Sequence, residues 1–228
     1  MSDPGDESAT CHTRASVRET FDEIGSHFAK TREYAWPEVE DFLDEVDPSG
    51  DAVGLDVGCG NGRHTELLAD VVATPIGVDP SRELLETARE RAAARGWTAR
   101  FCQGDAARLP LVAESIAVAV YVATLHHLPG REARVASLDE LARVLEPGGI
   151  ALVSAWSTAH DQFDASADAE TGFDTTIDWT LPGGETVSRF YHVYAPAEFE
   201  ADLAASGLAV EESVVSSGNC YARVSAEQ

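Results

Sequence analysis

Short apolar runs alternate with amphipathic segments along the middle of the chain. The apolar runs span 52–57, 75–78, 97–102, 115–122 and 150–156. Helical patterns span 61–69, 80–95 and 132–145. Strands that are apolar at nearly every position are typical of a parallel sheet with helices packed on both faces. The sequence therefore predicts a doubly wound α/β fold.

The two ends of the chain have different patterns. Residues 1–15 are polar and predict a disordered lead-in, and apolar positions spaced three and four apart then predict a helix over 17–28. Residues 157–188 are polar and irregular, which predicts an insertion or lid. Two short runs within 209–224 predict an antiparallel hairpin, which completes a mostly parallel seven-stranded sheet. We expect residues 16–228 to form a single domain.

The charge balance is strongly acidic. Forty Asp and Glu residues oppose 16 Lys and Arg, which gives a formal net charge of -24. Such self-repulsion is tolerated where salt shortens the Debye length to a few Å. The composition therefore favours a halophilic archaeal protein. Salt also weakens phosphate contacts, so the lack of a basic patch does not exclude an RNA substrate.

The cysteines and the hydropathy pattern exclude several classes. Cys11, Cys59, Cys102 and Cys220 are scattered, without the spacing of a metal site. No apolar run reaches the length that crosses a bilayer. We expect a cytoplasmic protein with no bound metal and no membrane association.

Three alternate glycines follow the first predicted strand. Gly58, Gly60 and Gly62 allow a tight turn and close approach to a ligand, and the helix start behind them offers free N–H groups. A dinucleotide fingerprint requires G-x-G-x-x-G, whereas the spacing here is G-x-G-x-G. Asp56 would repel a pyrophosphate but suits the ammonium group of a methionyl tail. The loop therefore favours S-adenosylmethionine as cofactor.

Two further acidic residues end the second and third predicted strands. Asp79 can accept hydrogen bonds from both ribose hydroxyls, and Asp105 from the adenine amino group. The predicted cofactor-binding residues are Asp56, Gly58, Gly60, Asn61, Gly62, Asp79, Asp105 and Ala106.

Several motifs resemble those of the tRNA wobble-uridine (carboxymethyluridine) methyltransferases, within the class I S-adenosylmethionine-dependent methyltransferases. They are Thr31-Arg32, Trp36-Pro37, the glycine loop, His126-His127-Leu128, Trp156, Arg189-Phe190-Tyr191-His192 and Ser217-Gly218-Asn219. The resemblance implies methyl esterification of 5-carboxymethyluridine in tRNA. It also implies a heterodimer with a small zinc-binding activator protein. The segment 157–187 departs from the family, because it is shorter and more acidic than the family's basic insertion.

The substrate carboxylate is ionised at neutral pH, so methyl transfer to it requires no general base. Cationic and donor groups would then hold one carboxylate oxygen while the other attacks. The predicted catalytic residues are Arg32, His127, Trp156, Arg189 and Tyr191.

Several alternatives remain open among these residues. Arg32 can bind the substrate or the carboxylate of the cofactor, and either His126 or His127 can face the site. Trp156 is either a stacking residue or part of the core. Arg189 and Tyr191 share one face of a strand, and His192 points away from it. The residues Arg131 and Arg134 would contact RNA phosphates or form a solvated helix face.

Two other functions are compatible with the cofactor loop. One is a methyltransferase that acts on a quinone or another small molecule, and the motifs around Arg32 and Arg189 count against it. The other is a scaffold that keeps the fold without turnover, and the intact glycines, Asp79 and Asp105 count against that.

Overall fold

The computed structural model of the chain describes residues 12–163 and 169–226. A seven-stranded sheet has the order β3-β2-β1-β4-β5-β9-β8. Its strands are β1 (Val53–Val57), β2 (Thr74–Asp79), β3 (Arg100–Gln103), β4 (Ile116–Tyr121), β5 (Leu145–Trp156), β8 (Leu208–Ser216) and β9 (Asn219–Ala226). The first five are parallel, and β9 is antiparallel to both β5 and β8. The prediction of a doubly wound sheet with a C-terminal antiparallel hairpin is confirmed.

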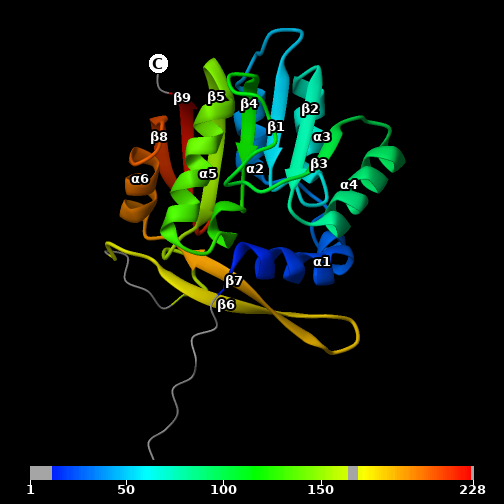
Figure 1. Ribbon diagram of the computed structural model, residues 1–228, viewed down its shortest axis with the longest axis vertical. Coiled ribbons are helices and arrows are strands. Elements are labelled where there is room, and N and C mark those ends of the chain that lie inside the picture. The colour runs from blue at the N-terminus through cyan, green and yellow to red at the C-terminus, as the bar shows by residue number, and fades with distance from the viewer. Residues whose placement is uncertain (1–11, 164–168, 227–228) are drawn as a thin grey trace, which may run out of the picture.

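Helices cover both faces of this sheet (Figure 1). They are α2 (Pro37–Asp44), α3 (Arg63–Val71), α4 (Arg82–Arg95), α5 (Arg131–Val144) and α6 (Pro196–Ala204). On one face α2 and α3 bury Phe42 and Leu68 against Val120. On the other face α5 and α6 bury Leu141 and Phe199. The strands are apolar on both sides because each side contacts one of these layers.

The first helix and a separate hairpin lie beneath the carboxyl ends of the parallel strands (Figure 1). Helix α1 spans Arg14–Lys30, and its N-terminus is closed by a capping box between Thr13 and Ser16. The helix packs against α4, and Asp22 accepts hydrogen bonds from the Ser81 hydroxyl and the Arg82 amide at the start of α4, both at 2.8 Å. Carboxylates suit this position because helix N-termini carry partial positive charge.

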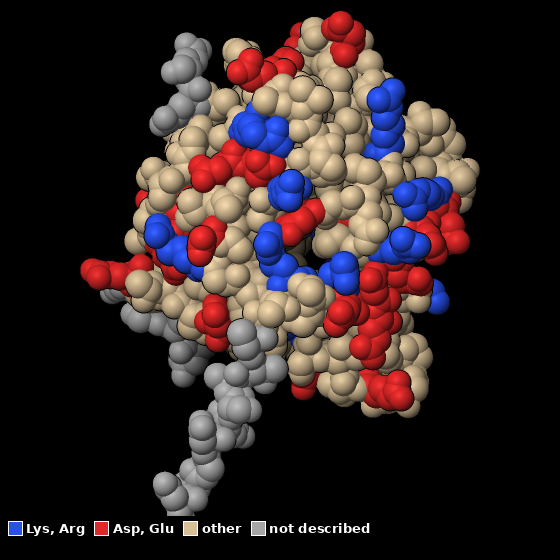
Figure 2. All heavy atoms as spheres, viewed as in Figure 1, with Lys and Arg blue, Asp and Glu red and all other residues tan. Residues whose placement is uncertain are grey.

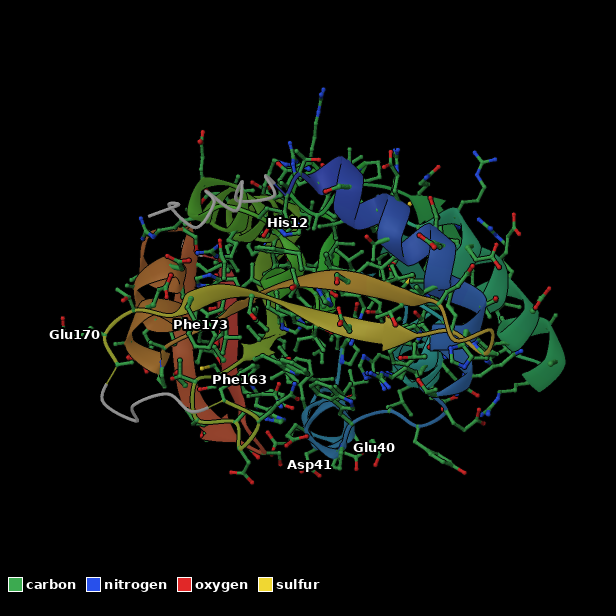
Figure 3. The ribbon with its side chains drawn as sticks, turned by 90° about the horizontal axis from the view of Figure 1, so that it is seen from below. His12, Glu40, Asp41, Phe163, Glu170 and Phe173 are labelled. Atoms are coloured by element: carbon green, nitrogen blue, oxygen red, sulfur yellow. The ribbon has the colours of Figure 1, made fainter. Side chains whose placement is uncertain are left out.

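The polar segment 157–188 is not irregular throughout, which corrects the expectation from sequence. Strands β6 (Phe173–Thr180) and β7 (Thr186–Val193) form an antiparallel hairpin that is separate from the main sheet. From Asp174 to Thr180 the side chains of β6 alternate between exposed and partly buried, and the exposed ones are polar. Viewed from below, the hairpin runs alongside α1 (Figure 3). Phe163 and Phe173 lie near one end of the hairpin.

The first helix overlaps the polar lead-in that the sequence predicts. Helix α1 begins at Arg14, so residues 14 and 15 of the predicted lead-in already belong to it. Residues 1–11 lie outside the described residues. None of the helices within 12–163 and 169–226 is long and apolar enough to cross a membrane.

Candidate active site

A cavity of about 1270 Å³ opens at the carboxyl ends of β1, β2 and β4. Its walls are the glycine loop, α1, the loop 31–36 and the short 3₁₀ helix η1 (Leu125–His127). Ligands of open α/β sheets bind at this edge, where the chain crosses from one face to the other. On the face of Figure 2, Lys and Arg side chains gather around a hollow in the lower half of the molecule.

The three alternate glycines all have left-handed backbones, with φ of 70° at Gly58, 53° at Gly60 and 78° at Gly62. A Cβ on Gly58 would lie 2.1 Å from the Thr124 hydroxyl, so this position admits glycine alone. A Cβ on Gly60 would meet no atom within 4 Å. Gly60 therefore leaves open space beside its backbone, into which a cofactor fits.

Asp79 holds the glycine loop from the end of β2. Its Oδ2 accepts from the Gly60 amide and its Oδ1 from the Ser81 amide, both at 2.8 Å. Burial raises the pKa of Asp79 to about 6. Asp79 lines the cavity, as do Asp105 and Ala106. This donor and acceptor set fits a nucleoside with a ribose next to β2 and an adenine next to Asp105.

Asp105 also closes the cavity on the side of α1. Its Oδ2 lies 2.5 Å from Nη1 of Arg14, and its Oδ1 accepts from the Ala107 amide at 2.9 Å. The Asp105 side chain remains 40% exposed, so the ion pair with Arg14 is screened by solvent.

Three predicted site residues lie outside the wall of the cavity: Asp56, Gly62 and Arg189. The carboxylate of Asp56 is buried under the loop and accepts from the Thr65 hydroxyl of α3 at 2.6 Å. Burial raises the pKa of Asp56 to about 7. Gly62 is the N-cap of α3 and packs toward Ala88. These two residues support the glycine loop from behind.

Asn61 lines the cavity and fixes the neighbouring loop. Its Nδ2 donates to the carbonyl oxygens of Ala29 at 3.1 Å and Arg32 at 2.9 Å. The end of α1 is therefore attached to the glycine loop, and Arg32 lies on the cavity wall.

The guanidinium groups of Arg32 and Arg189 share the same two aromatic neighbours. Arg32 lies 4.6 Å from the ring centroid of Phe28 and 5.9 Å from that of Trp179. Arg189 lies 5.7 Å and 5.0 Å from the same rings. Burial, with a smaller contribution from Arg189, lowers the pKa of Arg32. In the described residues neither guanidinium forms an ion pair with a carboxylate; their side-chain hydrogen bonds reach Thr31 and Tyr191.

Arg189 lies behind Tyr191, which does line the cavity. Nη1 of Arg189 donates to the Tyr191 hydroxyl at 2.6 Å, whereas its buried Nε has no partner among the described residues. Arg189 is 4% exposed and Tyr191 is 3% exposed. The positive charge of Arg189 thus reaches the cavity through the Tyr191 hydroxyl.

Aromatic rings form one wall of the cavity. Trp156 and Tyr191 stack with centroids 4.6 Å apart and an interplanar angle of 18°, and His126 stacks on Tyr191 at 5.1 Å. His127 lies 4.4 Å from Tyr191. Both histidines line the cavity, so the structure does not choose between them by position. Trp156 is a wall residue and only partly buried.

Of the two basic residues considered for RNA contact, Arg134 is buried and Arg131 stays on an exposed helix face. Arg134 is 3% exposed and pairs with Glu198 at 3.3 Å, and Arg131 pairs with Asp202 at 2.6 Å. Both contacts join α5 to α6. His192 points away from the cavity, with its ring nitrogens 2.7 Å from Asp174 and 3.0 Å from Glu198.

Several residues of this site leave no signal in the sequence. Thr124 packs on Gly58, Phe28 and Trp179 pack on the two arginines, and Cys59 lines the cavity. Trp179 gave no signal because it lies in the segment that reads as polar. No group of three or more potential metal ligands occurs among residues 12–163 and 169–226.

Comparison with known proteins agrees with this geometry. Residues 55–149 match the family model described as a methyltransferase domain. The tRNA (carboxymethyluridine(34)-5-O)-methyltransferase ALKBH8 of Mus musculus is 39% identical over 141 residues, which cover 62% of this chain and 20% of that protein. The tRNA (carboxymethyluridine(34)-5-O)-methyltransferase of Saccharomyces cerevisiae is 32% identical over 166 residues, 73% of this chain and 57% of that protein. The chain thus spans only part of these relatives.

A solved structure shares the whole fold. It is the methyltransferase in complex with the Haloferax volcanii Trm112 methyltransferase activator, with a TM-score of 0.66 and 16% identity. The alignment covers 93% of this chain and 98% of that one. At this identity the likeness establishes the fold. The family match and the named relatives confirm the predicted methyltransferase class. By sequence and by fold, the chain carries a class I S-adenosylmethionine-dependent methyltransferase domain.

Proposed function

We propose that this protein methylates the carboxylate of 5-carboxymethyluridine at the wobble position of tRNA. The observation that carries the proposal is the pair of arginines, Arg32 and Arg189, without a carboxylate partner in a chain that has 40 acidic residues. Leaving a buried cation uncompensated is costly, so such a pair is a typical anion site. A substrate carboxylate in the cavity would contact Arg32 directly and would meet the charge of Arg189 through the Tyr191 hydroxyl.

The charges along the cavity wall support an anionic substrate. Five basic residues line it, Arg14, Arg18, Lys30, Arg32 and Arg63, against three acidic ones, Glu33, Asp79 and Asp105. This reverses the ratio of the whole chain, in which acidic residues outnumber basic ones. A low-dielectric cleft of one sign concentrates ligands of the opposite sign.

The reaction we propose is an in-line methyl transfer. S-adenosylmethionine supplies an electrophilic methyl group on a sulfonium. One oxygen of the substrate carboxylate forms the new C–O bond while the C–S bond breaks, and no proton moves. Arg32 and the Tyr191 hydroxyl, polarised by Arg189, orient the carboxylate. Trp156 and the two histidines exclude water, so the rate comes from proximity and desolvation.

The residues proposed to hold the cofactor are Asp79, Asp105, Ala106 and those of the glycine loop. Asp56 and Gly62 support that loop from behind. Residues 16–228 are proposed to act as one catalytic domain. Its location in the cytoplasm and its origin in a halophile stay predictions from composition.

The names of the similar proteins support the proposed substrate and suggest a partner. The curated relatives are named tRNA (carboxymethyluridine(34)-5-O)-methyltransferases, and the structural neighbour was solved with the activator Trm112. We propose a heterodimer with a small activator protein of that kind, which binds zinc. Edge strands β3 and β8 are the two sheet edges such a partner can cover, and β8 exposes Val210, Val214 and Val215.

The test is transfer of labelled methyl to total tRNA in molar KCl, with and without the coexpressed activator. The tRNA is then digested and its nucleosides are identified by mass. Label in the methyl ester of 5-carboxymethyluridine supports the proposal. Bound cofactor with no label on any RNA contradicts it and favours a small-molecule substrate, whereas failure to bind the cofactor favours a scaffold.

The variant Arg32→Ala tests which carboxylate this arginine binds. We expect kcat/KM for tRNA to fall at least 100-fold, as when one oxyanion donor is lost, with cofactor affinity within threefold of wild type. Arg223→Ala is the matched control, because Arg223 forms an ion pair with Glu45 outside the cavity and its loss removes the same charge. A parallel loss of cofactor affinity in Arg32→Ala would assign Arg32 to the carboxylate of the cofactor.

A further inference from the structure

One aromatic side chain at the mouth of the cavity stands out from the surface. Tyr34 lines the cavity, yet 82% of it is exposed. Among the large apolar residues of the described chain no other is as exposed, and the next aromatic one, Phe173, is 39% exposed. The Tyr34 ring is therefore free to contact a ligand that enters the cavity.

The backbone that presents Tyr34 is held firmly. The carbonyl oxygen of Tyr34 accepts from Nη1 of Arg63 at 3.2 Å, and that of Glu33 accepts from Nη2 of Arg91 at 2.9 Å. The carbonyl of Arg32 accepts from Asn61 at 2.9 Å. Three consecutive carbonyls are thus tied to the glycine loop, α3 and α4, and the ring is presented from a preorganised loop.

Cations flank the same part of the rim. Lys30, Arg32 and Arg63 line the cavity on either side of Tyr34 in the chain. The Arg63 guanidinium stacks on Trp36 at 5.4 Å from the ring centroid. An exposed aromatic ring with cations beside it is the arrangement by which proteins bind single-stranded nucleic acid: bases stack on the ring and phosphates approach the cations.

We propose that Tyr34 is the stacking platform for a nucleobase next to the target uridine. The inference rests on the proposed function, since it requires an RNA substrate whose target nucleotide enters the cavity. The base that neighbours an extruded nucleotide loses a stacking partner, and the Tyr34 ring replaces it at the cavity mouth. Stacking is a short-range contact that does not depend on counterion release, so it persists in a protein of net charge -24 and in concentrated salt.

The test consists of two double-mutant cycles, one for each neighbour of the target uridine. Anticodon stem-loop RNAs carry 5-carboxymethyluridine, with the neighbouring nucleotide either intact or abasic, on each side in turn. The full chain is used as wild type and as Tyr34→Ala, in the form that methylates tRNA. On intact RNA we expect Tyr34→Ala to lower kcat/KM about tenfold, within the range for loss of one base–aromatic stack. On one of the two abasic RNAs the kcat/KM of wild type should fall by a similar factor. The kcat/KM of Tyr34→Ala on that RNA should equal its value on intact RNA.

Two controls accompany the cycles. Tyr34→Phe keeps the ring and should stay within twofold of wild type on every RNA. Val112→Ala changes a residue that is 76% exposed and does not line the cavity, and it should have no effect. The dissociation constant of S-adenosylmethionine should be equal in all variants.

Other outcomes would overturn the inference. Additive losses from Tyr34→Ala and each abasic site would show that the ring contacts neither neighbouring base. Weaker cofactor binding in Tyr34→Ala would make the ring a cover for the cofactor, and loss of copurifying activator would make it a protein contact. If wild type methylates neither total tRNA nor any stem-loop, the proposed function fails. Fluorescence anisotropy with an unmodified stem-loop then decides on Tyr34 alone, with about tenfold weaker binding by Tyr34→Ala supporting an RNA contact and equal binding excluding it.

Discussion

His126 and His127 are adjacent in the chain and face the same cavity with opposite hydrogen-bonding character. Nδ1 of His126 accepts from the Trp156 backbone amide at 3.0 Å, so its proton lies on Nε2. Nδ1 of His127 lies 2.9 Å from the Phe190 carbonyl oxygen and donates to it, so Nε2 of a neutral His127 is an acceptor. One ring thus offers the cavity an N–H and the other a lone pair.

These tautomers lead to a prediction about pH. Burial lowers the pKa of His126 well below its ordinary value and that of His127 to about 3. A group with a lowered pKa stays neutral above it, so both rings keep one form from pH 5.5 to 8. We expect no part of the pH dependence of kcat at saturating cofactor to follow either histidine over this range, and the substrate carboxylate is also ionised throughout.

The measurement is a pH–rate profile combined with long-range ¹H–¹⁵N NMR of the histidine rings. The spectra should show the Nε2–H form at His126 and the Nδ1–H form at His127, unchanged across the range. A rate limb with an apparent pKa between 6 and 7 that follows the titration of either ring would refute the assignment.

Arg189 leads to a second prediction. The variant Arg189→Ala removes the charge behind the Tyr191 hydroxyl, so we expect kcat/KM to fall at least 100-fold while cofactor affinity stays within threefold. Arg189→Lys should recover little, because an ammonium cannot stack on Trp179 and donate to Tyr191 with the geometry of a planar guanidinium. Steady-state kinetics and calorimetry with S-adenosylmethionine measure the two effects. Equal losses of turnover and cofactor affinity would show that Arg189 does not act on the substrate.

Two glycines of the loop form a matched pair for a third prediction. Gly58→Ala and Gly60→Ala both place an L-residue at positive φ, which costs about 1–2 kcal/mol. Only the Cβ on Gly58 meets Thr124, so overpacking should add about 1–3 kcal/mol there. We therefore expect the lower Tm in Gly58→Ala.

The effect on cofactor binding should follow a different order from the effect on stability. Gly60→Ala keeps most of its stability, but its methyl group enters the open space beside the loop, so S-adenosylmethionine should bind at least tenfold more weakly. Thermal melts without ligand and calorimetry with ligand separate the two quantities. Normal cofactor affinity in Gly60→Ala would place the cofactor elsewhere.

The parts of the structure that are visible in the sequence are those with local causes. The apolar runs of β1, β4 and β5 are buried on both faces, and the glycine loop between β1 and α3 follows from residues within one short segment. The acids Asp79 and Asp105 were placed by their positions at strand ends. Local periodicity and turn chemistry decide these features.

The features that the sequence did not reveal depend on distant partners. Arg134 reads as a surface residue, but Glu198 and Asp202 make its burial possible. Trp179 lies in a strand whose alternate residues are exposed, and its role appears only where it packs on Arg32, far away in the chain. Asp56 reads as a ligand for the cofactor, yet the helix that follows covers it. Such pairings are set by tertiary packing and leave no periodic signal.

The buried carboxylate of Asp56 gives a fourth prediction, on stability. Its pKa is raised by burial from an ordinary value near 3.8 to about 7. A raised pKa means that the folded state binds the proton more tightly than the unfolded state does. The stability that this group contributes is therefore complete below pH 4 and is lost progressively as the pH rises through 7, by at most about 1.4 kcal/mol per pH unit.

Asp56→Asn keeps the size of the side chain and an oxygen that can accept from the Thr65 hydroxyl, but it cannot ionise. We expect the variant and wild type to have similar free energies of unfolding at pH 4.5, and the variant to be increasingly more stable as the pH rises to 8. Urea unfolding in molar KCl at several pH values measures the difference. Asp70→Asn, at an exposed position of α3, controls for the general gain from removing one negative charge. A constant difference between Asp56→Asn and Asp70→Asn across this range would mean that Asp56 titrates with the same pKa in the folded and unfolded states.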